Sequence, residues 1–169
     1  MGGRRIVSLG RMSSVFVGVL ILAAWGLGGC SSSDMQPTSV NLTGTWKGTL
    51  THLNGAGVAV NAAVTWTATQ NSTNVTGPVS VIPSGQVIPV VGTIAGTISG
   101  SQVMLTLTIP EGSFVVFGGP QACSLTGTTT ANATSTSISG TVNETFAAAC
   151  IGTVSTSANQ VETLSLTKS

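Results

Sequence analysis

The amino-acid sequence predicts an all-β protein, an antiparallel up-and-down meander of about eight strands that forms a barrel or, alternatively, a β-sandwich. Three observations predict this class. Threonine, valine, serine, glycine and alanine dominate the chain after residue 40, and β-branched side chains suit a pleated, half-buried surface. Apolar and hydroxyl-bearing residues alternate with a period of two in successive segments. Short glycine- and serine-rich turns separate these segments, and strong helix formers are scarce.

The alternation defines each predicted strand in turn. In the first, Trp46 shares one face with leucines and glycines, and threonines occupy the other face. The turn at 99–101 joins two strongly alternating segments and predicts a hairpin. Pro78 interrupts the third segment, which indicates an edge or a bulge because proline cannot donate a ladder hydrogen bond. The predicted strands are 42–51, 64–69, 75–82, 90–99, 103–109, 123–131, 138–146 and 161–168, with a short strand or a loop at 114–117.

The N-terminal segment predicts an export signal. Arg4, Arg5 and Arg11 precede an almost wholly apolar stretch between Met12 and Gly29. Positive charge, an apolar stretch and small residues before a cleavage site form the pattern of a secretory signal peptide. The alternative, a transmembrane helix, needs about 20 apolar residues, and this stretch is slightly short and ends in glycines. The arginine pair lacks the fuller twin-arginine pattern, so it is better interpreted as ordinary signal-peptide charge.

The segment Leu27-Gly28-Gly29-Cys30 resembles the lipobox of bacterial lipoproteins, an aliphatic residue and two small residues before a cysteine. The resemblance implies cleavage before Cys30, a diacylglyceryl group on its thiol and anchoring in the cell envelope. Ser31 is not the aspartate associated in that family with inner-membrane retention, so we expect the outer membrane if the source is Gram-negative. The predicted parts are a signal peptide (1–29), a lipid-anchored polar tether (30–40) and a single β-domain (41–169).

The predicted domain is almost free of charge. Lys47 and Lys168 are its only lysines, and every arginine of the chain lies in the predicted signal peptide. So little positive charge cannot neutralise phosphates, which excludes nucleic-acid binding. A disordered low-complexity chain is the alternative for such a composition, but the apolar residues recur too regularly for disorder.

Cys123 and Cys150 remain besides Cys30. Outside the cytoplasm such a pair predicts a disulfide rather than two free thiols. A hairpin of the strands 123–131 and 138–146 would bring both cysteines to one end of the sheet. Metal binding would need further ligands, and only His52 is available, so we expect no metal.

Gly44-Thr45-Trp46 on the first strand resembles the Gly-x-Trp signature of the calycins, the lipocalin-like and avidin-like barrels. The resemblance implies an up-and-down barrel in which the tryptophan packs across the closed end and the glycine allows close backbone approach. The terminal strand 164–168 is similar to their closing strand. Lipocalins stack an arginine on this tryptophan, and Lys168 is the only candidate substitute here. The chain contains no tyrosine, so the resemblance does not extend to biotin binding.

Candidate catalytic groups are few, and we expect no enzyme and no cofactor. The only histidine, His52, is interpreted as a solvent-exposed residue at a strand end. Glu144 and Glu162 fall on the apolar register of their strands and could face inward, although frayed strand ends that expose both are favoured. Phe114 and Phe117 are interpreted as packing residues, with a barrel lid as the alternative.

These observations predict an envelope-anchored, non-catalytic protein that binds a small apolar or uncharged ligand inside a lipocalin-like barrel. The alternative is a structural or interaction module of the cell envelope with a filled barrel and no small-molecule ligand. The membrane is the expected partner of the N-terminal lipid, and protein partners are not predicted. The expected ligand-lining residues are Trp66, Ile94, Leu105 and Leu107.

Overall fold

The computed structural model describes residues 39–116, 119–155 and 157–169. The predicted signal peptide, Cys30 and residues 31–38 of the predicted tether lie outside the described residues. In the part of the chain that the structure describes, no helix has the length and apolar character needed to cross a membrane. The elements are β1 (Gly44–Leu53), β2 (Ala59–Asn71), β3 (Asn74–Ile82), β4 (Val90–Ser99), β5 (Gln102–Ile109), β6 (Val115–Val116), β7 (Gly119–Pro120), β8 (Leu125–Ala133), β9 (Ser137–Phe146), the 3-10 helix η1 (Ala148–Cys150) and β10 (Asn159–Lys168).

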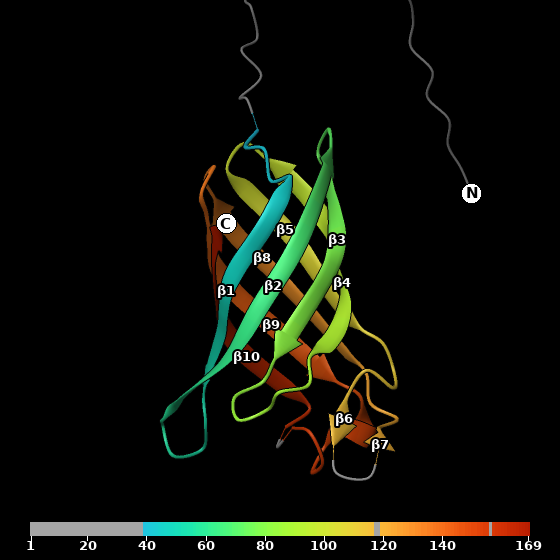
Figure 1. The fold of residues 1–169 in the computed structure, drawn as a ribbon. Coiled ribbons are helices and arrows are strands. Elements are labelled where there is room, and N and C mark those ends of the chain that lie inside the picture. Colours follow the sequence, from blue (N-terminus) through green and yellow to red (C-terminus); the bar gives the residue numbers. More distant parts are fainter. Residues whose placement is uncertain (1–38, 117–118, 156) are drawn as a thin grey trace, which may run out of the picture. The chain divides into compact units, whose positions relative to one another are not determined.

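Eight antiparallel strands close into one barrel (Figure 1). Their order around the barrel is β1-β10-β9-β8-β5-β4-β3-β2, so the chain is an up-and-down meander whose last strand pairs with its first. The short sheet of β6 and β7 belongs to the connection from β5 to β8. This architecture confirms the predicted all-β meander and the lipocalin-like barrel, and it excludes the sandwich alternative.

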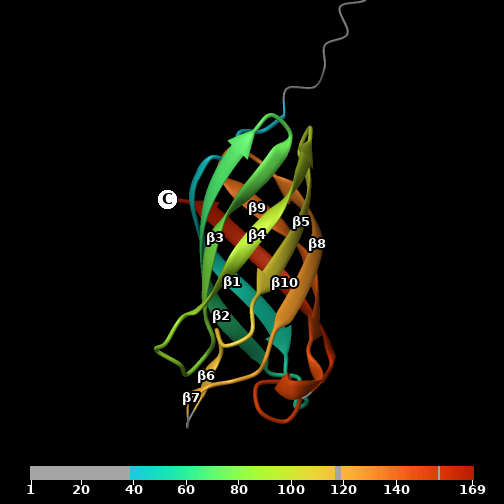
Figure 2. The same cartoon turned by 90° about the vertical axis from the view of Figure 1, so that its right-hand side faces the viewer.

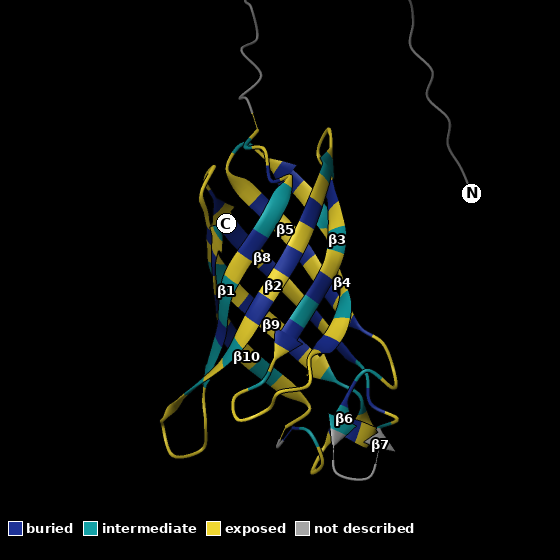
Figure 3. Ribbon diagram, in the orientation of Figure 1, coloured by how far each residue is buried: buried dark blue, intermediate teal, exposed yellow. Residues whose placement is uncertain are grey.

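Burial alternates along the strands, as Figure 3 shows. On β8 every second residue from Leu125 to Ala133 is buried, and the threonines and the asparagine between them are exposed. The inward residues of all eight strands form one apolar core. Burial of this apolar face is the main term that stabilises the barrel, because each Å² of apolar surface removed from water contributes roughly 25 cal/mol.

One end of the barrel is closed by the segment that leads into β1. Trp46 is fully buried there, and its Nε1 donates a hydrogen bond of 2.7 Å to the carbonyl oxygen of Leu42. The Leu42 N–H donates to Oε1 of Gln70 at 2.7 Å, which holds the segment on β2. Lys168 Nζ lies 5.4 Å from the centroid of the Trp46 ring. The lysine therefore occupies the position at which the calycin resemblance implies an arginine.

Gly44 provides the space for this arrangement. Its φ is +137°, in the region that side chains rarely adopt, and a Cβ at this position would lie 2.8 Å from Lys168 Cε. The glycine of the Gly-x-Trp signature is thus required by backbone conformation and by the path of the lysine stem.

The position of Pro78 differs from its prediction. β3 has a partner strand on both sides, so Pro78 does not lie on an edge. Pro78 pairs with Thr93 of β4, whereas the ladder between β3 and β2 lacks pairs at 77–78 and resumes in the same register beyond them. A local gap in one ladder is enough to accommodate the missing N–H.

The two ends of the barrel carry connections of different length, which Figures 1 and 2 show from two sides. The turns at the Trp46 end are short, and the connections at the opposite end are long. We call the opposite end the open end. Its connections are 54–58, 83–89, 110–124 and 147–158, and those at the closed end are 72–73, 100–101 and 134–136.

Candidate ligand-binding site

The open end of the barrel holds a pocket of about 400 Å³. Inward residues at the ends of the strands form its walls, and the long connections form its mouth. Apolar side chains form somewhat more of the wall than polar ones, because the strand ends continue the inward-facing register of the core. Apolar residues that line it include Leu50, Val81, Val90, Leu107, Phe114 and Phe146.

A much smaller void of about 20 Å³ lies deeper in the barrel. Leu50, Val81 and Leu107 line both the void and the pocket. Thr129 also lines the void, and its buried hydroxyl has no hydrogen-bond partner among the described residues. Of these two spaces among the described residues, only the pocket at the open end has room for a ligand.

The predicted ligand-lining residues lie at three different depths. Leu107 lines the pocket. Ile94 and Leu105 line only the deeper void. Trp66 is fully buried and lines neither space, so these two spaces give no support to its prediction as a ligand-lining residue. Alternation identifies inward residues, but it does not identify how far along the barrel axis the interior is filled.

Glu144 of β9 and Glu162 of β10 both point into the pocket. Glu144 is 5% exposed and Glu162 is 7% exposed, so the prediction that frayed strand ends expose both carboxyl groups is wrong. Both strands continue past these residues: Glu144 pairs with Gln160 across the β9–β10 ladder. Because the ladder and the long connections extend beyond them, the two carboxyl groups are enclosed.

His52 also takes part in this site, and its interpretation as an exposed strand-end residue is wrong. Its side chain is 28% exposed, and its Nδ1 lies 3.0 Å from Oε1 of Glu162. Gln160 Nε2 donates a hydrogen bond of 2.8 Å to the same oxygen. Glu162 is thus held by partners from β1 and β10. Among the described residues, Glu144 has no such partner.

The surroundings of the pocket raise the pKa of both carboxyl groups. Burial, and to a lesser extent the nearby charge of Glu162, raises the pKa of Glu144 from 4.5 to about 8. Burial also raises the pKa of Glu162, although the contacts with His52 and Gln160 oppose this effect. At neutral pH Glu144 is therefore mostly protonated, and its carboxyl group can either donate or accept a hydrogen bond.

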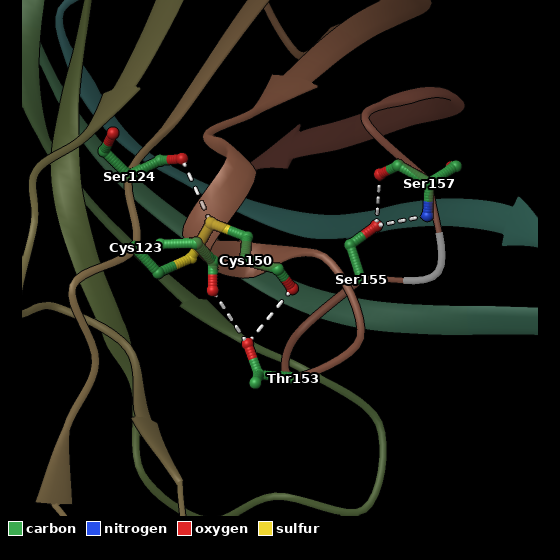
Figure 4. Close-up of a disulfide and its surroundings, with 7 residues drawn as sticks. Cys123, Ser124, Cys150, Thr153, Ser155 and Ser157 are labelled. Carbon is green, nitrogen blue, oxygen red and sulfur yellow. Dashed lines mark hydrogen bonds between the residues drawn. A yellow bond between two sulfur atoms is a disulfide. The ribbon is translucent and has the colours of Figure 1, made fainter.

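A disulfide between Cys123 and Cys150 supports one side of the mouth and confirms the predicted pairing (Figure 4). Its Cα atoms are 4.9 Å apart, and it joins the segment before β8 to η1. In the following loop, the Thr153 hydroxyl donates to the carbonyl oxygen of Cys150 at 3.2 Å, and the Ser155 hydroxyl donates to that of Ser157 at 2.8 Å. The pocket wall at this point is thus tied to the sheet.

Phe114 and Phe117 are the remaining candidates that the sequence indicated. Phe114 is buried and lines the pocket, whereas Phe117 lies outside the described residues. Gln160 was not singled out from the sequence, although its place two residues before Glu162 puts it on the same face of β10. Within the described ranges, no three His, Cys, Asp or Glu side chains lie close enough together to hold a metal ion.

Comparison with known proteins adds no relative from which a ligand could be inferred. No protein-family model matches the chain, and no curated protein and no solved structure matches it. The site is therefore interpreted from its own geometry.

Proposed function

We propose that this protein is an envelope-anchored lipoprotein that binds a small, mainly apolar molecule in the open end of its barrel and catalyses no reaction. The observation that carries this proposal is the pocket of about 400 Å³. Small-molecule sites typically enclose about 300–1,000 Å³ and combine apolar walls with a few polar groups that orient the ligand. The pocket has this size, and its wall combines apolar side chains with polar ones.

Affinity would come mainly from burial of the ligand's apolar body, at roughly 25 cal/mol for each Å² removed from water. The walls belong to a closed sheet, so little conformational entropy is lost when the ligand enters. Glu144, Glu162, His52 and Gln160 form one polar side of the pocket and would orient the ligand.

The hydroxyl groups near the mouth support a non-catalytic role. Thr153, Ser155 and Ser157 donate hydrogen bonds to backbone carbonyl oxygens. His52 instead faces Glu162. A serine or threonine nucleophile would need a base within hydrogen-bond reach, and the described residues do not pair one with His52.

The anchoring part of the proposal rests on the lipobox-like segment and Cys30, which lie outside the described residues. The full chain, Cys30→Ser and the matched control Ser31→Ala would be expressed with a labelled fatty acid. We expect label and membrane association for the full chain and for Ser31→Ala, and neither for Cys30→Ser. Persistent labelling of Cys30→Ser would contradict lipidation at this cysteine.

Native mass spectrometry of the protein purified from its own cell envelope tests whether a ligand is bound. We expect a reproducible additional mass that disappears on denaturation. Ala62 is half-buried and lines the pocket, whereas Ala63 next to it is exposed. Ala62→Trp should fill the pocket and abolish the additional mass, and Ala63→Trp should retain it.

An interaction module is the second candidate, and one observation favours it. Several large apolar residues on or beside the connections of the open end are exposed, with Val87 91% and Leu53 70% exposed. Such residues can mark a protein interface. A ligand-free mass for the folded wild-type protein, together with co-purification of a partner that Val87→Ser releases, would replace the ligand-binding proposal with this one.

A further inference from the structure

Acidic side chains outnumber basic ones in the lining of the pocket. Glu144 and Glu162 supply two acids, and His52 is the only basic side chain in the lining. Of the two lysines in the described residues, Lys168 lies over Trp46 at the closed end and Lys47 is exposed on the outer face. A ligand carboxylate or phosphate would therefore find no lysine or arginine in the pocket to pair with.

The carboxyl group of Glu144 lacks a partner of its own. It is 5% exposed, it faces the pocket, and no described residue donates a hydrogen bond to it. The neighbouring strands supply few polar groups: β10 provides Glu162 and Gln160, and β1 provides His52. On β8, the residue directly opposite Glu144 in the ladder is Gly127, which has no side chain. Buried polar groups are normally hydrogen-bonded. The carboxyl group of Glu144 is therefore able to form a hydrogen bond with a ligand in the pocket.

We propose that the pocket selects an organic cation, an amphiphile whose protonated amine lies against Glu144 and whose apolar body packs among Leu107, Phe114 and the other apolar wall residues. This inference rests on the proposed ligand-binding function and names the class of ligand. The amine supplies the donors that Glu144 lacks, and Glu162 adds a second acidic side chain to the same side of the pocket. His52 remains paired with Glu162 and leaves Glu144 to the ligand.

The protonation of Glu144 adds a measurable consequence. With a pKa of about 8, its carboxyl group is mostly protonated at neutral pH in the free protein. Binding of an ammonium group favours the carboxylate, so the carboxyl O–H bond breaks and the proton passes to the buffer. The ligand keeps its ammonium protons, and binding releases close to one proton per amine.

Three probes with the same skeleton separate charge from apolar burial: 4-phenylbutylamine, 4-phenylbutan-1-ol and 4-phenylbutanoate. Calorimetric titration would use the full-length protein in lipid nanodiscs, with empty nanodiscs as the blank. We expect the amine to bind about tenfold or more tightly than the alcohol, and the carboxylate to bind weakest, because charge-assisted hydrogen bonds exceed neutral ones. Titrations in buffers of different ionisation enthalpy count the released protons.

Glu144→Gln should reduce amine affinity by about tenfold and abolish proton release, whereas alcohol affinity should change much less, because glutamine can still hydrogen-bond a hydroxyl group. Glu111→Gln makes the same substitution at an exposed loop residue and should change none of these. Equal affinity for amine and alcohol, or tighter carboxylate binding, would overturn the cation inference while the proposed function stands. If none of the three probes binds to the folded protein, both proposals fail.

Discussion

At the scale of single residues, the closed end shows how a short motif depends on a distant side chain. Trp46 is buried under Lys168, and Gly44 provides the backbone conformation and the space that the lysine stem needs. The glycine and the tryptophan act together because both contact the last strand. The contact between the lysine and the indole ring adds a cation–π attraction of about 0.5–1 kcal/mol at such sites.

Gly44→Ala tests this arrangement. A side chain at φ +137° would be strained and would displace Lys168, so we expect the free energy of unfolding to fall by about 1–3 kcal/mol. Gly55→Ala is the control, since no heavy atom lies within 4 Å of a Cβ built at Gly55. Urea denaturation compares the two, and equal stability of both variants would contradict the role given to Gly44.

A second prediction at the scale of single residues concerns Thr129. Its hydroxyl is buried without a hydrogen-bond partner, and valine has nearly the same shape. Thr129→Val should therefore raise the free energy of unfolding by about 1 kcal/mol. The neighbouring Thr128 is exposed, so Thr128→Val should have little effect. Destabilisation by Thr129→Val would mean that the hydroxyl has a partner in solution.

At the scale of elements, alternation within a strand predicted much of what the structure contains. The eight predicted barrel strands correspond to β1–β5 and β8–β10, and the Cys123–Cys150 pairing follows from the β8–β9 hairpin. β2 is longer than predicted, because the residues before Val64 also alternate between outward and half-buried positions. Closure of the barrel removed the edge that was one of the two positions predicted for Pro78, the other being a bulge.

Removal of the disulfide tests how the elements of the open end are held together. It joins residues separated by 27 positions, and a loop of that size corresponds to a stabilisation of about 3–4 kcal/mol. Replacing both cysteines by serine should lower the free energy of unfolding by about that amount and weaken ligand binding, because the loop that carries Thr153 and Ser155 lines the pocket. Unchanged stability and binding would show that the loop is held by other contacts.

At the scale of the whole molecule, the site depends on contacts that no single strand reveals. Glu144 and Glu162 lie on the inward register, which the sequence already indicated, but their burial depends on strands and connections that are distant in sequence. His52 reaches Glu162 only because β1 pairs with β10 across the closure of the barrel. Strand patterns therefore predicted the direction of these side chains, and barrel closure determined their environment.

Stability should depend on pH through the same groups. Burial raises the pKa of Glu144 from 4.5 to about 8, so the folded state holds this proton more tightly than the unfolded state does. The stabilisation is fully present below pH 4.5 and is lost as the pH rises through about 8. Since one pKa unit corresponds to about 1.4 kcal/mol, the loss amounts to several kcal/mol. Burial of Glu162 acts in the same direction.

Glu144→Gln removes the largest part of this dependence. The variant should be more stable than the wild type at pH 8 and similar to it at pH 4.5, which urea denaturation across this range would measure. Glu111→Gln, on an exposed loop, should keep the wild-type dependence. A wild-type stability that rises between pH 4.5 and pH 8 would contradict the burial of Glu144.

The central claim is that the open end of the barrel encloses a ligand pocket with a buried, protonated carboxyl group. Carbon NMR of glutamate labelled at the side-chain carboxyl tests it most directly, because the chain has only Glu111, Glu144 and Glu162 and each signal can be assigned by substitution. We predict that Glu144 titrates with a midpoint near 8 and that Glu162 titrates above its ordinary value. Titration of both near 4.5 would show solvated carboxyl groups and contradict the enclosed pocket.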